Sequence, residues 1–179
     1  GIESNERRIV FTVANEEKTK KLIQAQKRHM HIGVPGHGIV IAVPIKSVGG
    51  GKTVAFLNGE TDNAAYTPSL NYAHELIVAV CSQGCTDMVM NAARAAGARG
   101  GTVLHGKGTG AKGAPKFYNI TIAQEKEMIL IVAATSQKAA IMQSILKKAG
   151  PDSKAGTILF SLPTTQVAGF ALLDNQDET

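Results

Sequence analysis

The sequence predicts an α+β fold in which β-α-β units combine into one sheet. Short apolar runs rich in β-branched residues alternate with segments whose apolar residues recur at helical spacing. Aromatic residues make up only 4% of the 179 residues and Trp is absent, whereas hydrophobic residues reach 44%. A core of this composition must consist of Ile, Val, Leu, Ala and Met, which suits strands and helices packed in layers.

The N-terminal part of the chain predicts a strand, a helix and a second strand. RRIVFTVA at residues 7–14 is apolar and β-branched, and Asn15 followed by two glutamates is typical of a helix N-cap with an acidic first turn. The turn-forming VPGHG then precedes IVIAV at residues 39–43. We assign residues 1–50 to one βαβ half-unit and residues 51–74 to a linker.

A second strand–helix–strand unit follows the linker. ELIVAVC at residues 75–81 predicts a strand, and TDMVMNAARAA at residues 86–96 predicts a helix with its apolar residues on one face. Gly97 is positioned to end this helix. GGTVLHG at residues 100–106 supplies the second strand of the unit.

A third unit begins with EMILIVAA at residues 127–134. Thr135 and Ser136 are candidate helix caps, Gly150 is expected to stop the helix, and TILFSLP at residues 157–163 closes the unit. It repeats the pattern of the N-terminal half-unit about 120 residues later, which indicates an internal duplication.

Together the second and third units define one complete domain over residues 75–170. The order β-α-β-β-α-β is that of the ferredoxin-like, or split βαβ, fold. The polar residues 171–179 are expected to form a tail.

A glycine-rich segment lies at the second strand of this domain. AGARGGTV, followed by Lys107, Gly108 and Gly110, resembles the A-G-x-x-G-x-T-V-x-x-x-K-G-x-G segment of the PII nitrogen-signalling proteins. The resemblance extends in element order over residues 75–168. It implies a cytoplasmic homotrimer that regulates a target protein in nitrogen metabolism and binds ATP, ADP or AMP as effector in clefts between subunits.

The resemblance also implies which residues bind the nucleotide. Gly100 and Thr102 would border the adenine, whereas Gly108 and Gly110 would lie near the phosphates, where a backbone without side chains can approach closely. The implied set is Gly100, Thr102, Lys107, Gly108, Gly110 and Lys154, the last from P-D-S-K, a loose counterpart of the family's G-D-G-K turn. On residues alone, the later glycines are equally consistent with a flexible loop.

The chain departs from the family in three places, the first of which is a longer spacing from Lys154 to Pro163 than the family has. V-A-G at residues 167–169 stands where the family carries basic residues that hold phosphates. Only GAKGAPKFYN at residues 110–119 corresponds to the long loop with which the family contacts its targets. These departures predict altered phosphate binding and a loop of shorter reach.

The burial pattern predicts assembly. Ile129 to Val132 run consecutively as apolar residues, as do Ile39 to Val43, and such runs indicate strands buried on both faces. A single domain has helices for one face only, so the other face is expected to meet other subunits in a trimer.

Charge and hydropathy limit the partners. The net charge of +5 and pI of 9.3 permit a phosphate-rich ligand or an acidic partner, but the basic residues are dispersed and lack interleaved aromatics, so nucleic acid is not expected. The longest apolar runs, such as Met128 to Ala134, are too short to cross a bilayer, and no leader opens the sequence. We therefore expect a soluble protein with no membrane insertion.

Motifs for metal binding and catalysis are weak. Cys81 and Cys85 match no zinc framework and are interpreted as ordinary thiols. The histidines at 29, 31 and 37 are a metal alternative, opposed by basic neighbours. GGGKT lacks the first Gly of a Walker A loop, because Lys46 occupies that position.

Neither G-x-S-x-G nor H-E-x-x-H occurs, and no enzyme is predicted. Asp87, Glu125 and Glu127 are interpreted as first-turn or strand-flanking charges, and His105 is a weak candidate for ligand contact. The alternative function is a divalent-metal-binding or structural trimer resembling the cation-tolerance proteins.

Overall fold

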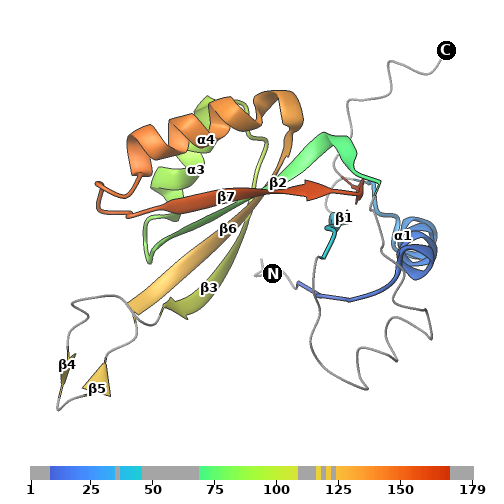
Figure 1. Cartoon of the computed structure of the whole chain (residues 1–179), viewed down its shortest axis with the longest axis horizontal. Coiled ribbons are helices and arrows are strands. Elements are labelled where there is room, and N and C mark those ends of the chain that lie inside the picture. The colour runs from blue at the N-terminus through green and yellow to red at the C-terminus, as the bar shows by residue number, and fades with distance from the viewer. Residues whose placement is uncertain are drawn as a thin grey trace, which may run out of the picture.

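The computed structural model describes residues 9–34, 37–45, 69–108, 116–117, 120–121 and 124–169 (Figure 1). The helices are α1 (Glu16–Met30), α3 (Thr86–Ala95) and α4 (Thr135–Ala149). The strands are β1 (Val40–Ala42), β2 (Asn71–Ser82), β3 (Thr102–Gly108), β4 (Lys116–Phe117), β5 (Ile120–Thr121), β6 (Gln124–Ala134), β7 (Ile158–Thr164) and β8 (Gln166–Ala168).

The main sheet has four strands in the order β3-β6-β2-β7, and every neighbouring pair is antiparallel. Helices α3 and α4 lie side by side on one face of this sheet, and the other face carries neither of them (Figure 1). Chain order β2-α3-β3-β6-α4-β7 with this strand order is the ferredoxin-like fold. The predicted fold class is therefore confirmed.

The core between helices and sheet is aliphatic. Alternate residues of the central strands, such as Ile77 on β2 and Ile129 and Ile131 on β6, point toward the helices and are fully buried. Val89 of α3 and Ile141 of α4 complete the layer. No aromatic ring belongs to this buried cluster among the described residues, as the composition predicts.

The residues predicted to cap or end the helices do so, except at the start of α4. Asn15 caps α1 as predicted, its Oδ1 accepting from the Lys18 backbone N–H at 2.9 Å. Gly97, at φ 101°, follows the end of α3, and Gly150 caps α4. The expected caps on α4 are wrong: β6 runs directly into the helix, so Ala134 occupies the N-cap and Thr135 is already helical.

The N-terminal half-unit differs from its prediction. Residues 9–14, the described part of the expected first strand, adopt no regular structure, and Val10 and Phe11 are each 83% exposed. Strand propensity produces a strand only where a neighbour supplies hydrogen bonds. The helix is formed, and β1 pairs antiparallel with β8, with Ile41 opposite Val167.

The division into domains stays a prediction, with its boundaries partly outside the described residues. Residues 51–68 of the expected linker and the tail at 171–179 lie outside them. Residues 71–74, also assigned to the linker, are the first residues of β2.

The second face of the main sheet is covered at one end. There Leu76, Val78 and Val132 are buried, and Ile41 and Val167 of the β1–β8 pair pack against them. The N-terminal segment thus supplies part of the cover that this apolar face requires.

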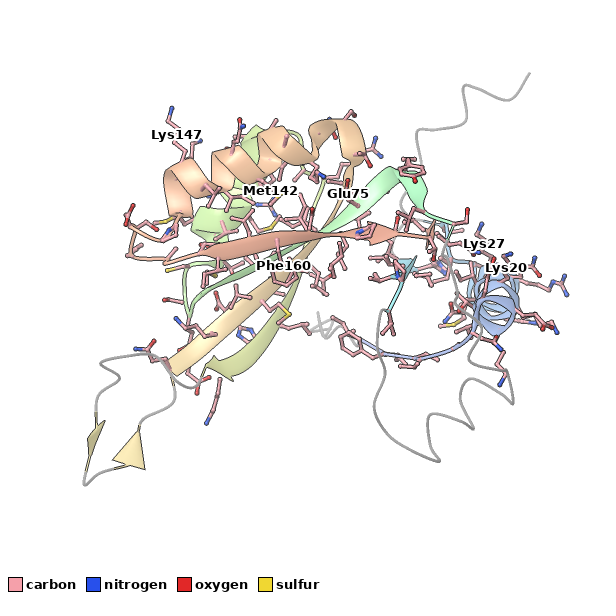
Figure 2. The ribbon with its side chains drawn as sticks, viewed as in Figure 1. Lys20, Lys27, Glu75, Met142, Lys147 and Phe160 are labelled. Carbon is pink, nitrogen blue, oxygen red and sulfur yellow. The ribbon has the colours of Figure 1, made fainter. Side chains whose placement is uncertain are left out.

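The rest of that face is open. Leu104, Met128, Val80 and Ile158 are register partners in one row across all four strands. Ile158 is 67% exposed, and Phe160, opposite Val78, is 46% exposed. Figure 2 shows Phe160 on the side of β7 away from Met142 of α4. We call Leu104, Met128, Val80, Ile158 and Phe160 the open apolar face.

Gly100 and Gly101 directly precede β3 and differ in the space that surrounds them. A Cβ at Gly101 would lie 3.0 Å from the Met90 Sδ and 3.2 Å from both Ile129 and Ile131, whereas one at Gly100 would meet nothing within 4 Å. Overpacking costs about 1–3 kcal/mol. Gly101→Ala should lower the free energy of unfolding by about that amount in urea denaturation. Gly100→Ala is the matched control, and equal losses would contradict this packing.

Candidate functional site

The predicted phosphate-side residues lie at the end of β3. Lys107 pairs with Glu125 of β6, its Nζ 3.6 Å from Glu125 Oε1, and Gly108 pairs with Gln124. A Cβ on Gly108 would lie 3.0 Å from Lys126 Cγ, so the glycine leaves room for that side chain. Gly110 lies outside the described residues.

Lys126 is a residue that sequence reasoning missed. It lies on β6 opposite Gly106, and its ammonium donates to Ser82 Oγ at 3.2 Å. The signal in the sequence was weak, because its partner comes from a strand 44 residues away. Lys126 adds a second cation at this end of the sheet, on the face opposite to that of Lys107.

Lys154 lies in the turn between α4 and β7. This turn is fixed to the end of β2: the Ser82 N–H donates to the Ala155 carbonyl at 2.9 Å, and Cys85 Sγ lies 3.9 Å from the Lys154 carbonyl oxygen. The exposed Lys154 is therefore at the same end of the sheet as Gly108, although β6 and β2 separate this turn from β3.

The predicted adenine-side residues lie at the opposite end of β3. Thr102 begins the strand opposite Leu130, whereas Gly108 ends it opposite Gln124. At about 3.3 Å per residue, the strand spans roughly 20 Å between them. One chain therefore presents the predicted residues as two separate groups, with Gly100 and Thr102 in one group and Lys107, Gly108 and Lys154 in the other.

Glu127 forms a buried polar cluster beside the phosphate-side group. Its carboxylate accepts from the Gly84 and Thr86 backbone N–H groups, both at 3.1 Å, and from Thr86 Oγ1 at 2.6 Å. It thereby caps the N-terminus of α3 from a neighbouring strand. The interpretation of Glu127 as a flanking charge is wrong, because the residue is only 5% exposed and its carboxylate accepts these three hydrogen bonds.

The hydrogen bonds and charges of this cluster favour the ionised form of Glu127 over the protonated form. The Thr86 hydroxyl holds the pKa of Glu127 below its ordinary value, against the effect of burial, and the two backbone donors and His105 act in the same direction. His105 Nδ1 lies 3.8 Å from Glu127 Oε1, and its side chain is largely exposed. The cluster thus links β3, β6 and α3.

The cysteines are free and buried. Burial raises the pKa of Cys81 to about 11, and the nearby Glu127 charge adds to this shift. A thiol of that pKa is rarely ionised near neutrality, so Cys81 is a poor nucleophile and metal ligand.

The histidine alternative gains no support from geometry. The His31 and His37 rings meet edge to face with centroids 6.1 Å apart, and His37 Nδ1 lies 3.1 Å from the Met30 carbonyl oxygen. Across the described ranges, no three His, Cys, Asp or Glu side chains gather as metal ligands. In the same ranges, none of the helices has the length and apolar character needed to span a membrane.

The antiparallel four-stranded sheet with two helices on one face defines a ferredoxin-like protein, and the glycines at the end of β3 stay a predicted ligand site. The family model for nitrogen regulatory protein P-II matches residues 74–170, more than half of the chain. The chain belongs to this family, whose members are regulators and not enzymes. The match excludes α1 and β1.

The solved structures matched include the PII protein of Arabidopsis thaliana bound to citrate. The sequence identity is 20%, the TM-score is 0.40, and the alignment covers 51% of this chain and 77% of that one. None of the curated proteins matches the sequence.

Proposed function

We propose that this protein is a cytoplasmic PII-type signal transducer that binds an adenine nucleotide between the subunits of a homotrimer. Nucleotide binding would order the loop that follows Gly108, and the ordered loop would regulate a target protein of nitrogen metabolism. The change would be a local order–disorder switch set by phosphate contacts.

The observation that carries this proposal is the distribution of the candidate residues in a chain of the P-II family. Thr102 and Gly108 lie at opposite ends of β3, so one chain does not close a pocket around both groups. A second copy would complete a site at each end. The open apolar face supports such an assembly, because exposed rows of Ile, Met and Phe are typical of surfaces that meet a partner.

The phosphate-side group has the chemistry that an anion requires. Lys107, Lys126 and Lys154 lie at one end of the sheet, and Glu125 neutralises part of their charge. Lysine binds phosphate as a point charge, and glycine lets backbone N–H groups approach it. This arrangement supports a phosphate site that does not depend on the basic residues missing at 167–169.

Titration calorimetry tests the function with ATP, ADP and AMP in separate experiments, each with and without Mg²⁺, and with divalent ions alone. We expect heat with at least one nucleotide. Heat with the ions and none with any nucleotide would instead favour the metal-binding alternative.

A substitution at the strand end separates ligand binding from folding. Gly108→Val should abolish nucleotide binding, because the new side chain meets Lys126 and blocks close approach to the backbone. Circular dichroism and thermal unfolding should change little, since Lys126 is flexible and the site contributes little core. Gly110→Val should also abolish nucleotide binding without unfolding the protein. Gly106→Val is the control, because a Cβ at Gly106 meets nothing within 4 Å. Global unfolding of the Gly108 variant would show that this glycine is structural.

A further inference from the structure

A cavity of about 330 Å³ lies where the N-terminal segment meets the main domain. The N-terminal segment contributes Lys27, Ile32 and Gly33, and the main domain contributes His74 and residues 167–169. Its volume lies within the usual range for small-ligand sites, roughly 300–1,000 Å³. In Figure 2, Lys27 projects from α1 near the end of β7.

The described lining of this cavity carries positive charge only. Among those residues Lys27 is charged and His74 contributes an imidazole, and neither Asp nor Glu is one of them. Glu75, next to His74, belongs to the opposite face of β2, where Lys138 binds both of its oxygens at 2.8 and 3.0 Å.

The acids of α1 are also remote from the cavity. Glu16 and Glu17 belong to the first turn and pair with Lys20 and Lys21, whereas Lys27 and Arg28 belong to the last turn. Ten residues of helix separate Glu17 from Lys27, which is about 15 Å. The described lining therefore combines the Lys27 cation, the His74 imidazole and the apolar side chains of Ile32 and Val167, with no carboxylate among these residues.

We propose that this cavity binds a small phosphate or carboxylate anion, and that the anion fastens the N-terminal segment to the main domain. The described direct attachment between them consists of the β1–β8 pairing and the packing of Ile41 and Val43 against the sheet. Strands β1 and β8 share three residue pairs, and the Thr165 N–H donates to the Ala42 carbonyl at 2.9 Å. A ligand that contacts both sides of the cavity binds the attached state alone, and so stabilises that state by mass action.

Within one chain, this cavity lies at the opposite end of the main sheet from the phosphate-side group of the proposed nucleotide site. His74 pairs with Ala134 at one end of β6, whereas Lys107 and Gly108 pair with Glu125 and Gln124 at the other. Anion binding in this cavity can therefore be tested whether or not the chain binds a nucleotide.

Hydrogen exchange of the β1 amides in the full chain tests the proposal. Inorganic phosphate and succinate are added separately, each against sodium chloride of equal ionic strength. Exchange at Val40–Ala42 should slow about tenfold when the anion reaches ten times its Kd. Slowing with phosphate alone identifies a phosphate site, slowing with succinate alone a carboxylate site, and either supports the proposal.

The Lys27→Met variant should lose this response. Lys20→Met is the matched control, since it removes the same charge from the first half of the same helix and should respond as the original chain does. Circular dichroism verifies that both variants remain folded. No slowing with either anion, or an undiminished response in Lys27→Met, would overturn the proposal.

Discussion

Glu127→Ala should lower the free energy of unfolding by about 3 kcal/mol. The change leaves the Gly84 and Thr86 N–H groups and the Thr86 hydroxyl without their acceptor. Unsatisfied buried donors cost about 1–3 kcal/mol each before the site relaxes or admits water. Urea denaturation at pH 7 measures the loss.

Glu125→Ala is the control for this prediction. Glu125 lies two residues away on the same strand, its side chain is 44% exposed, and its ion pair with the exposed Lys107 is worth no more than about 0.5 kcal/mol. A loss as small in Glu127→Ala as in Glu125→Ala would contradict the capping role of Glu127.

The same carboxylate gives stability a pH dependence of known sign. The pKa of Glu127 is lower in the folded protein than its ordinary value of 4.5, chiefly because the Thr86 hydroxyl donates to the ionised form. Its contribution is therefore fully present above pH 4.5 and is lost as the pH falls through the folded-state pKa. The stability difference between the original chain and Glu127→Gln should shrink over that interval in acid titrations followed by circular dichroism.

Ile158→Asp should convert the assembled protein to monomers. Ile158 is 67% exposed in the single chain and shares a row with Val80, Met128 and Leu104. A charge placed within an apolar interface must lose its hydration without gaining a partner, which costs several kcal/mol per subunit. Light scattering at low micromolar concentration should report a trimer for the original chain and the 18.8 kDa monomer for the variant.

Leu146→Asp is the matched control for the open apolar face. Leu146 is also an exposed apolar residue, at 47%, but it lies on α4, in the helical layer on the other side of the sheet. Its substitution should leave the trimer intact. A monodisperse monomer for the original chain would contradict the assembly and, with it, the nucleotide site between subunits.

Features encoded over short stretches were predictable from the sequence. Apolar runs rich in β-branched residues located the strands of the main sheet, and Asn15, Gly97 and Gly150 marked helix ends through their own side-chain or backbone chemistry. The cap expected at Thr135 failed because capping residues are informative only where a loop precedes the helix, and here β6 continues straight into α4.

Features that join distant segments were not predictable. Glu127 looks like any strand-flanking acid until the sheet brings it to Gly84 and Thr86, more than 40 residues earlier. The cavity lined by Lys27 and His74 likewise exists only because α1 and β2 meet in space. The candidate nucleotide residues were assigned by family resemblance, and their role stays a prediction.

The pairing of β1 with β8 has a consequence for the order of folding. It joins residues 40–42 to residues 166–168 and so encloses the entire four-stranded sheet within one loop of chain. The entropy lost on closing a loop grows with the length of its disordered chain, so this contact becomes favourable only after the intervening sheet has collapsed. Substitutions in β1 should therefore accelerate unfolding and leave the folding rate unchanged, since their contacts form after the transition state.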